Sequence, residues 1–180
     1  ACLDFWVKPN MLRSISKRDC DITVFTATTK PEGILGINPD LIFLSNGPGD
    51  PDDLDEIVGN VKKMIGKKPI VGICLGHQIL ARVFGGKTGK LKFGHRGGNH
   101  PVKDFEENKV FITAQNHGYY VTDVPECMNV TQVNLNDNTV EGMRHKELPI
   151  YSVQYHPEAC PGPKDSQYIF DKFLDVLNNK

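Results

Sequence analysis

A cysteine framed by glycines, at the junction of an apolar strand and a helix, constrains this chain more than any other feature. Residues 69–80 read PIVGICLGHQIL, in which the β-prone run 69–73 leads directly into helical spacing. Gly72 and Gly76 flank Cys74, and glycine permits sharp turns and close backbone contacts that a side chain would block. A buried core cysteine would not require such neighbours. The run is the thiol counterpart of the G-x-S-x-G elbow, in which a strained turn lifts a nucleophile above a sheet.

The position of this cysteine offers two further contributions to catalysis. A helix N-terminus carries a partial positive charge that favours a thiolate. The backbone N–H of Leu75, the next residue, would point at the oxyanion that forms when a carbonyl is attacked. The alternative is a small core cysteine at a strand end, which the flanking glycines disfavour. The run therefore predicts a cysteine nucleophile beside an oxyanion donor.

A thiol nucleophile needs a base, and the chain offers six histidines for that role: His77, His95, His100, His117, His145 and His156. His156 is the preferred candidate because it ends the apolar run 149–155, a strand that could lie beside the elbow strand. Glu158 follows after one proline and would hold the tautomer of the imidazole. His77 lies on the helix of the cysteine and is expected to pack or cap. We therefore predict a Cys74–His156–Glu158 triad.

Strand-like and helix-like segments alternate in the first half of the chain. The β-prone runs are 21–27, 40–45 and 69–73. Helical patterns begin at Asp50-Pro51 and at Leu75. In the second half, consecutive β-prone runs are separated by short turns: 109–115, 129–135, 138–144 and 149–155. A last helical pattern follows at 169–177. Alternation of strands and helices is typical of a parallel sheet with helices on both faces. Consecutive strands joined by short turns are typical of antiparallel pairing. We predict one three-layer α/β domain over residues 1–180, with a mainly parallel central sheet and a smaller antiparallel sheet.

Three turns rich in glycine or histidine follow expected strands: SNGPGDP (45–51), GICLGHQ (72–78) and YHPE (155–158). In open α/β sheets, ligands bind outside the carboxyl ends of the strands. We therefore expect the active site at that edge of the sheet.

Composition excludes several classes of partner. The 180 residues carry 21 Lys and Arg against 22 Asp and Glu, without a basic stripe for nucleic acid or a polybasic run for a membrane surface. Five scattered cysteines without a C-x-x-C pair argue against a disulfide framework or a structural zinc site and favour a reducing, cytoplasmic setting. The chain begins without Met, directly in an expected strand, so we expect a fragment whose upstream part is absent.

The ordered motifs resemble a known family over nearly the whole chain. G-I-C-L-G-H-Q with a later Y-H-P-E resembles the class I (triad) glutamine amidotransferases, whose fold is flavodoxin-like. Further motifs narrow the resemblance to the glutaminase domain of the carbamoyl-phosphate synthetase small subunit: residues 3–13, 43–51, 92–102, 113–118 and 156–163. The G-G-N-H-P and Q-N-H-G blocks discriminate this subfamily from the anthranilate and GMP synthetase glutaminases.

The resemblance implies a reaction and a set of site residues. Cys74 would attack the side-chain amide of L-glutamine, His156 would protonate the departing ammonia, and water would hydrolyse the glutamyl thioester. The backbone N–H groups of Gly47 and Leu75 would stabilise the oxyanion. The residues implied to bind glutamine are Gly47, Gly49, Leu75, Gln78, Asn116, Gly118 and Tyr119. The segment around His95 to His100 is expected to form a structured loop near the partner, and we assign no catalytic role to it.

The reaction also implies a partner. Ammonia released into neutral water becomes ammonium, which is not a nucleophile, so the resemblance implies transfer to the synthetase large subunit. No phosphate-cradling G-x-x-x-x-G-K-[ST] motif is present, so ATP and Mg are expected only on that subunit, and no cofactor or metal in this domain. The motifs leave open whether the product serves pyrimidine or arginine synthesis.

Three residues depart from the family pattern, and other functions remain open. Trp6 stands where the family has glycine, and it could fill core, cover the sheet end or crowd the pocket. Pro9 precedes Asn10, and Cys160 stands where serine is common. The alternatives are a glutaminase of another synthetase, a stand-alone γ-glutamyl thiol hydrolase, and an inactive interaction module. The complete triad set argues against the last.

Overall fold

A single mixed sheet organises the molecule. The computed structural model describes residues 1–178, whose nine strands follow the order β2-β1-β3-β4-β9-β8-β7-β5-β6. The parallel half contains β1 (Cys2–Asp4), β2 (Val24–Thr26), β3 (Ile42–Leu44), β4 (Ile70–Ile73) and β9 (Ile150–Val153). The antiparallel half contains β5 (Lys87–Asp104), β6 (Lys109–Asp123), β7 (Met128–Asn134) and β8 (Val140–His145). The predicted fold class is confirmed, although the antiparallel strands continue the same sheet and do not form a second one.

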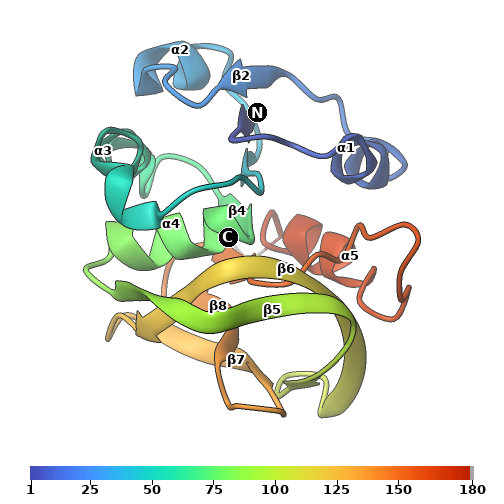
Figure 1. The fold of residues 1–180 in the computed structure, drawn as a ribbon. Helices are drawn as coiled ribbons and strands as arrows, with labels where there is room; N and C mark the ends of the chain where they lie inside the picture. Colours follow the sequence, from blue (N-terminus) through green and yellow to red (C-terminus); the bar gives the residue numbers. More distant parts are fainter. Residues whose placement is uncertain (179–180) are drawn as a thin grey trace.

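Helices cover both faces of the parallel half (Figure 1). One face carries α2 (Pro31–Gly36), α3 (Asp55–Met64) and α4 (Leu75–Val83), and the other carries α1 (Pro9–Ser16) and α5 (Ile169–Asp175). Successive side chains of a strand point to opposite faces. In β3, Ile42 and Leu44 accordingly pack with α3 and α4, whereas Phe43 packs against Phe173 of α5. Two apolar cores therefore lie on either side of one sheet.

The predicted helix after Asp50 begins differently from expectation. Pro51–Asp53 forms a 3₁₀ turn, with the Asp50 side chain accepting a hydrogen bond from Asp52 N at 2.9 Å. Leu54 then leaves the helical region (φ −109°, ψ 35°), and α3 starts at Asp55. Proline and acidic residues thus mark a helix start, but the continuous helix begins four residues later.

The prediction of a loop around His95–His100 is wrong, because this segment lies within β5. His95 pairs with His117 of β6, and the register shifts on both sides of that pairing. Gly94 and Gly97 take positive φ values of 71° and 107°, a conformation that lets the strand bulge and bend. Figure 1 shows β5 and β6 as one long curved hairpin. The glycine-rich composition of this segment gave no strand signal, and pairing with β6 stabilises β5.

No helix within residues 1–178 is both long enough and apolar enough to cross a membrane.

Candidate active site

Cys74 sits on a strained turn between β4 and α4. Its backbone has φ 55° and ψ −104°, and it forms the N-cap of α4. A methyl group on Gly72 would lie 2.7 Å from the carbonyl carbon of Gly76, and one on Gly76 would clash with the carbonyl oxygen of Leu44. The glycines therefore let helix and strands approach closely, while the cysteine itself takes the unusual conformation. The geometry has the form of a nucleophile elbow.

Strand pairing brings the base to this turn. Strand β9 lies beside β4, and the Cys74 N–H donates to the Val153 carbonyl at 2.9 Å. His156 follows β9, and its N–H donates to Ala114 of β6 at 2.8 Å. Cys74 and His156 consequently line the same cavity, of about 390 Å³. Residues 82 positions apart in sequence meet because their strands end side by side.

The carboxylate of Glu158 lies beside the imidazole of His156. His156 Nδ1 lies 2.8 Å from Glu158 Oε1, and both side chains are buried. The other ring nitrogen, Nε2, has no hydrogen-bond partner within residues 1–178. It is the nitrogen available for proton exchange at the cavity.

The charges of this group support one another. Burial alone would lower the pKa of His156, but the neighbouring Cys74 and Glu158 outweigh burial and raise it. Burial likewise would raise the pKa of Glu158, but His156 and then Lys8 lower it. Lys8 Nζ lies 3.3 Å from Glu158 Oε1 and 3.3 Å from His156 Nδ1. The neighbours of His156 therefore favour its protonated form, which can donate a proton at the cavity.

Two backbone donors are free near the nucleophile. Neither Gly47 N nor Leu75 N donates a hydrogen bond to a protein atom in the described part of the chain. A methyl group on Gly47 would clash with Phe5 and would lie 2.8 Å from Leu75 Cδ2, so this turn must remain glycine to pack. Gly47 also lines the cavity. The arrangement suits the predicted pair of oxyanion donors.

The predicted glutamine-binding residues divide into two groups. Gly47 and Asn116 belong to the cavity wall, whereas the other five lie outside the set of described residues that line it: Gly49, Leu75, Gln78, Gly118 and Tyr119. Gln78 is buried, and its Nε2 donates to the Tyr119 carbonyl at 2.8 Å and to Gln154 Oε1 at 3.0 Å. Its amide thus ties α4 to β6 and to the residue that follows β9.

Four residues of the cavity wall lie outside the predicted set of site residues: Trp6, Lys8, Asn46 and Pro48. Of these, Trp6 was expected to fill core, cover the sheet end or crowd the pocket. Trp6 has φ 117° and a side chain that is 77% exposed, so it does not fill core. That φ value favours glycine, which explains the glycine of the family pattern. A lysine shortly after an N-terminal strand gives no local signal, because its contacts to His156 and Glu158 are long-range.

His77 packs as expected, and His145 also lies outside the cavity. His77 is fully buried, and its Nδ1 lies 2.9 Å from Ser152 Oγ. Burial lowers the pKa of His77 to about 3, so this ring is neutral and packs against β9. His145 Nδ1 accepts from the backbone N–H groups of Glu147 and Leu148 in a turn. Cys160 is exposed and free.

The sequence profile of the family Glutamine amidotransferase class-I matches residues 1–176. The chain belongs to this family. The amidotransferase domain is 66% identical over 174 residues to the carbamoyl phosphate synthase small chain of Clostridium perfringens, covering 97% of this chain and 50% of that protein. It is 51% identical over 180 residues to the small chain of Methanocaldococcus jannaschii, covering 99% of this chain and 51% of that one. The chain thus spans about half the length of these relatives.

Solved structures share the fold of this amidotransferase domain at low identity. A putative GMP synthase protein from Thermoplasma acidophilum aligns with a TM-score of 0.85 and 23% identity, covering 99% of this chain and 92% of that one. The structure of SMU.1228c aligns with a TM-score of 0.74 and 16% identity, covering 99% and 97% of the two chains. At such identities the likeness concerns the fold alone.

Proposed function

We propose that this domain is the glutaminase of a carbamoyl-phosphate synthetase small chain. It hydrolyses the side-chain amide of L-glutamine to glutamate and ammonia. The observation that carries the proposal is the convergence of Cys74 and His156 on one cavity at the carboxyl ends of β4 and β9, with Glu158 bonded to the imidazole of His156. The high identity to carbamoyl phosphate synthase small chains supports the choice of synthetase.

The residues divide the reaction into two displacements. The Cys74 thiolate attacks the amide carbon, and the N–H groups of Leu75 and Gly47 stabilise the oxyanion. His156 donates its proton to the nitrogen, the carbon–nitrogen bond breaks, and ammonia leaves a glutamyl thioester. The neutral imidazole then takes a proton from water, whose oxygen attacks the thioester. Carbon–sulfur cleavage releases glutamate, and Glu158 stabilises the imidazolium each time it forms.

Glutamine recognition is assigned to the pocket wall and to its support. The side chain of Asn116 lines the cavity, and a methyl group on Gly118 would meet open space, so the backbone there is accessible. Gln78 donates through Nε2, and its Oε1 accepts no hydrogen bond within residues 1–178. Directed amide and backbone groups suit the ammonium and carboxylate of an amino acid. Gly49 and Tyr119 complete the proposed set.

The ammonia is proposed to pass to a synthetase large subunit, where ATP and Mg would take part. Free ammonia in neutral water becomes ammonium and loses its nucleophilicity, so direct transfer preserves it. The proposed setting is the cytoplasm, where thiols remain reduced. Each of the five cysteines is free, which agrees with that setting.

Glutamate release from L-glutamine tests the proposal. Cys74→Ala should abolish release, whereas Cys127→Ala, at a half-buried cysteine far along the chain, should retain it. Retained release in Cys74→Ala would remove Cys74 from its role. Faster cleavage of substituted γ-glutamyl amides than of glutamine would instead support a stand-alone thiol hydrolase. Ammonia transfer to a GMP or anthranilate synthetase, and not to the carbamoyl-phosphate enzyme, would correct the synthetase.

A further inference from the structure

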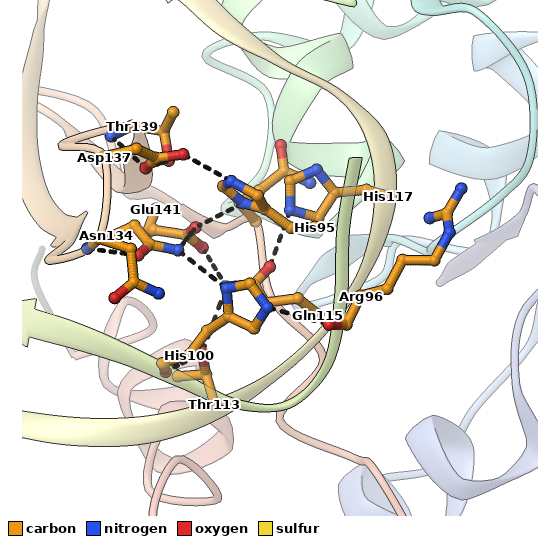
Figure 2. A network of polar contacts seen from close by, with 12 residues as sticks. His95, Arg96, His100, Thr113, Gln115, His117, Asn134, Asp137, Thr139 and Glu141 are labelled. Atoms are coloured by element: carbon orange, nitrogen blue, oxygen red, sulfur yellow. Dashed lines mark hydrogen bonds and ion pairs between the residues drawn. The ribbon is translucent and has the colours of Figure 1, made fainter. Parts of the chain in front are cut away.

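A second cluster of chemically capable side chains lies between the antiparallel strands (Figure 2). His95 of β5, His117 of β6 and Glu141 of β8 are buried, with exposed fractions of 8%, 6% and 0%. One donor atom from each lies within 4.8 Å of the others. Neither histidine nor the glutamate lines the cavity of Cys74. The mechanism above makes no use of them.

The first observation concerns His95, which pairs with Asp137 through one ring nitrogen but makes no hydrogen bond to Glu141 through the other. Its Nε2 lies 2.7 Å from Asp137 Oδ2, and this pairing fixes a proton on that nitrogen. Its buried Nδ1 has no hydrogen-bond partner within residues 1–178 and lies 3.7 Å from Glu141 Oε1. That separation is too long for a hydrogen bond. It suits two ligands of one ion, which at ~2.1 Å from the metal lie roughly 3.4 Å apart in a tetrahedral site.

The second observation concerns His117, both of whose nitrogens face oxygen acceptors. Nδ1 lies 2.7 Å from the Tyr119 carbonyl, and Nε2 lies 2.8 Å from Gln115 Oε1. The Gln115 amide cannot usefully flip, because its Nε2 donates to Glu141 Oε2 at 2.9 Å. A neutral imidazole carries one hydrogen and one lone pair. With that hydrogen on Nδ1, two lone pairs face each other at Nε2, and a cation between them would remove the conflict.

The third observation is the uncompensated charge of Glu141. This carboxylate is fully buried, and its hydrogen-bond donors within residues 1–178 are the neutral amides of Gln115 and Asn134. Burying a carboxylate is costly without a positive partner. A proton on His95 Nδ1, which lies 3.7 Å from Glu141 Oε1, is the competing source of charge. That proton would satisfy Glu141, but it would leave the conflict at His117 unresolved.

We propose that His95 Nδ1, His117 Nε2 and Glu141 bind one divalent transition-metal ion, with Gln115 Oε1 as the fourth ligand. Two imidazoles with a carboxylate and an amide oxygen form a donor set that suits Zn²⁺. Ligating histidines usually donate their other N–H to a carboxylate or a carbonyl. Asp137 and the Tyr119 carbonyl supply these acceptors here. Binding would draw the donor atoms of His95, His117 and Glu141 closer than their present separation of up to 4.8 Å. It would also move Gln115 Oε1 slightly away from His117 Nε2, since these two atoms now lie only 2.8 Å apart.

The site would be structural and would clamp β5, β6 and β8 together. His117 stands between Asn116 and Gly118, so the clamp would hold the strand that forms part of the cavity wall. The inference rests on the geometry of the cluster and does not depend on the proposed glutaminase activity.

Cobalt binding tests the proposal on chelator-treated, metal-free protein. The expected result is one Co²⁺ per chain, with visible absorption bands of a tetrahedral site that disappear when Zn²⁺ displaces the cobalt. Glu141→Gln keeps size and hydrogen bonds but removes the charge, and it should abolish the bands. His145→Gln, at the last residue of β8 and outside the cluster, should bind like the unmodified protein.

A milder variant covers the case in which Glu141→Gln fails to fold. Asp137→Asn changes a partly exposed residue that orients His95, and it should weaken metal binding about 10–100-fold while the protein stays folded. Absence of stoichiometric binding to the unmodified protein would overturn the proposal in favour of a proton-filled network. Binding that neither Glu141→Gln nor Asp137→Asn weakens would overturn the assigned ligands. Neither outcome would bear on the role of Cys74.

Discussion

Cys74 occupies a backbone conformation that most residues avoid, and its partners arrive from a different part of the chain. Such strain persists only where the surroundings impose it, and it is concentrated at functional sites. The local motif predicted the nucleophile, because elbow geometry depends on neighbours within two residues. Lys8 and His156 are 148 positions apart in sequence, so no local sequence pattern predicts their contact. Residues whose role is set by tertiary contact therefore escaped prediction.

The pH dependence of catalysis should report the coupling of Glu158 to His156. The pKa of His156 is raised in the folded protein, so its imidazolium is present below that value and is lost as the pH rises through it. In Glu158→Gln one of the groups that raise this pKa is gone, so the alkaline limb of kcat/KM should move to lower pH. Profiles of glutamate release over roughly pH 6–10 would show the shift. Glu147→Gln, at an exposed carboxylate, serves as the control, and an unmoved limb in Glu158→Gln would contradict the coupling.

At the scale of elements, the contact between α4 and β3 depends on the absence of side chains. In Gly76→Ala the new methyl group would clash with backbone of Leu44, which cannot swing away. We expect the free energy of unfolding to fall by about 1–3 kcal/mol or more, measured by urea denaturation. Gly59→Ala in α3 is the matched control, because nothing lies within 4 Å of its added methyl. That change should raise stability by about 0.5–1 kcal/mol, and equal effects at both glycines would refute the packing argument.

A buried carboxylate attaches α5 and the segment before it to the antiparallel strands. Asp104 is fully buried, and it accepts from Tyr168 Oη at 2.6 Å and from Gln132 Nε2 at 2.6 Å, with Lys172 Nζ at 3.4 Å. Burial alone would raise the pKa of Asp104, but these donors and nearby backbone N–H groups lower it. Its stabilising contribution is therefore complete above the ordinary pKa of 3.8 and is lost as the pH falls through the lower folded value.

Asp104→Asn should accordingly lower stability at neutral pH by about 1.5–3 kcal/mol and flatten its decline in acid. Thermal denaturation across an acidic pH series would measure both effects. Asp53→Asn, at an exposed acidic side chain, should change neither. An unchanged acid limb in Asp104→Asn would assign acid sensitivity to other carboxylates, such as Glu106.

Strand content was predicted best where apolar runs are short and regular. The observed β3, β4, β7, β8 and β9 fall on predicted runs, and their bounds differ by a few residues at most. Strand β5 was missed because glycine and histidine weaken its local preference, and pairing with β6 overrides composition. Helices α1 and α2 are short, each beginning at a proline, and their apolar faces are too small to stand out in sequence.

For the whole molecule, sheet order explains why the site lies at one edge. The nucleophile, the base and the proposed oxyanion turn follow β4, β9 and β3, which are neighbours in the sheet. The alternation of strands and helices predicted this edge, in line with the rule for open α/β sheets. The joining of the antiparallel strands to the same sheet could not be predicted, because it depends on the pairing of β8 with β9.

The proposed partner should change the behaviour of the whole enzyme. With a carbamoyl-phosphate synthetase large chain and ATP, the full small chain should support glutamine-dependent carbamoyl phosphate formation, because ammonia passes between the two chains. The Cys74→Ala complex should lose this activity but keep formation from added ammonium, which bypasses glutamine. Isotope-labelled glutamine would follow the nitrogen. Loss of both activities in the variant would indicate a damaged complex, and equal labelling by free ammonium would contradict direct transfer.

The exposed tryptophan of the cavity wall has a practical consequence. Trp6 is the only tryptophan of the 180 residues, and this largely exposed residue lines the cavity. Indole emission moves to shorter wavelength when water is excluded. The fluorescence of Trp6 should therefore report ligand binding at the cavity. Fluorescence of the Cys74→Ala protein would follow the arrival of a ligand without any turnover.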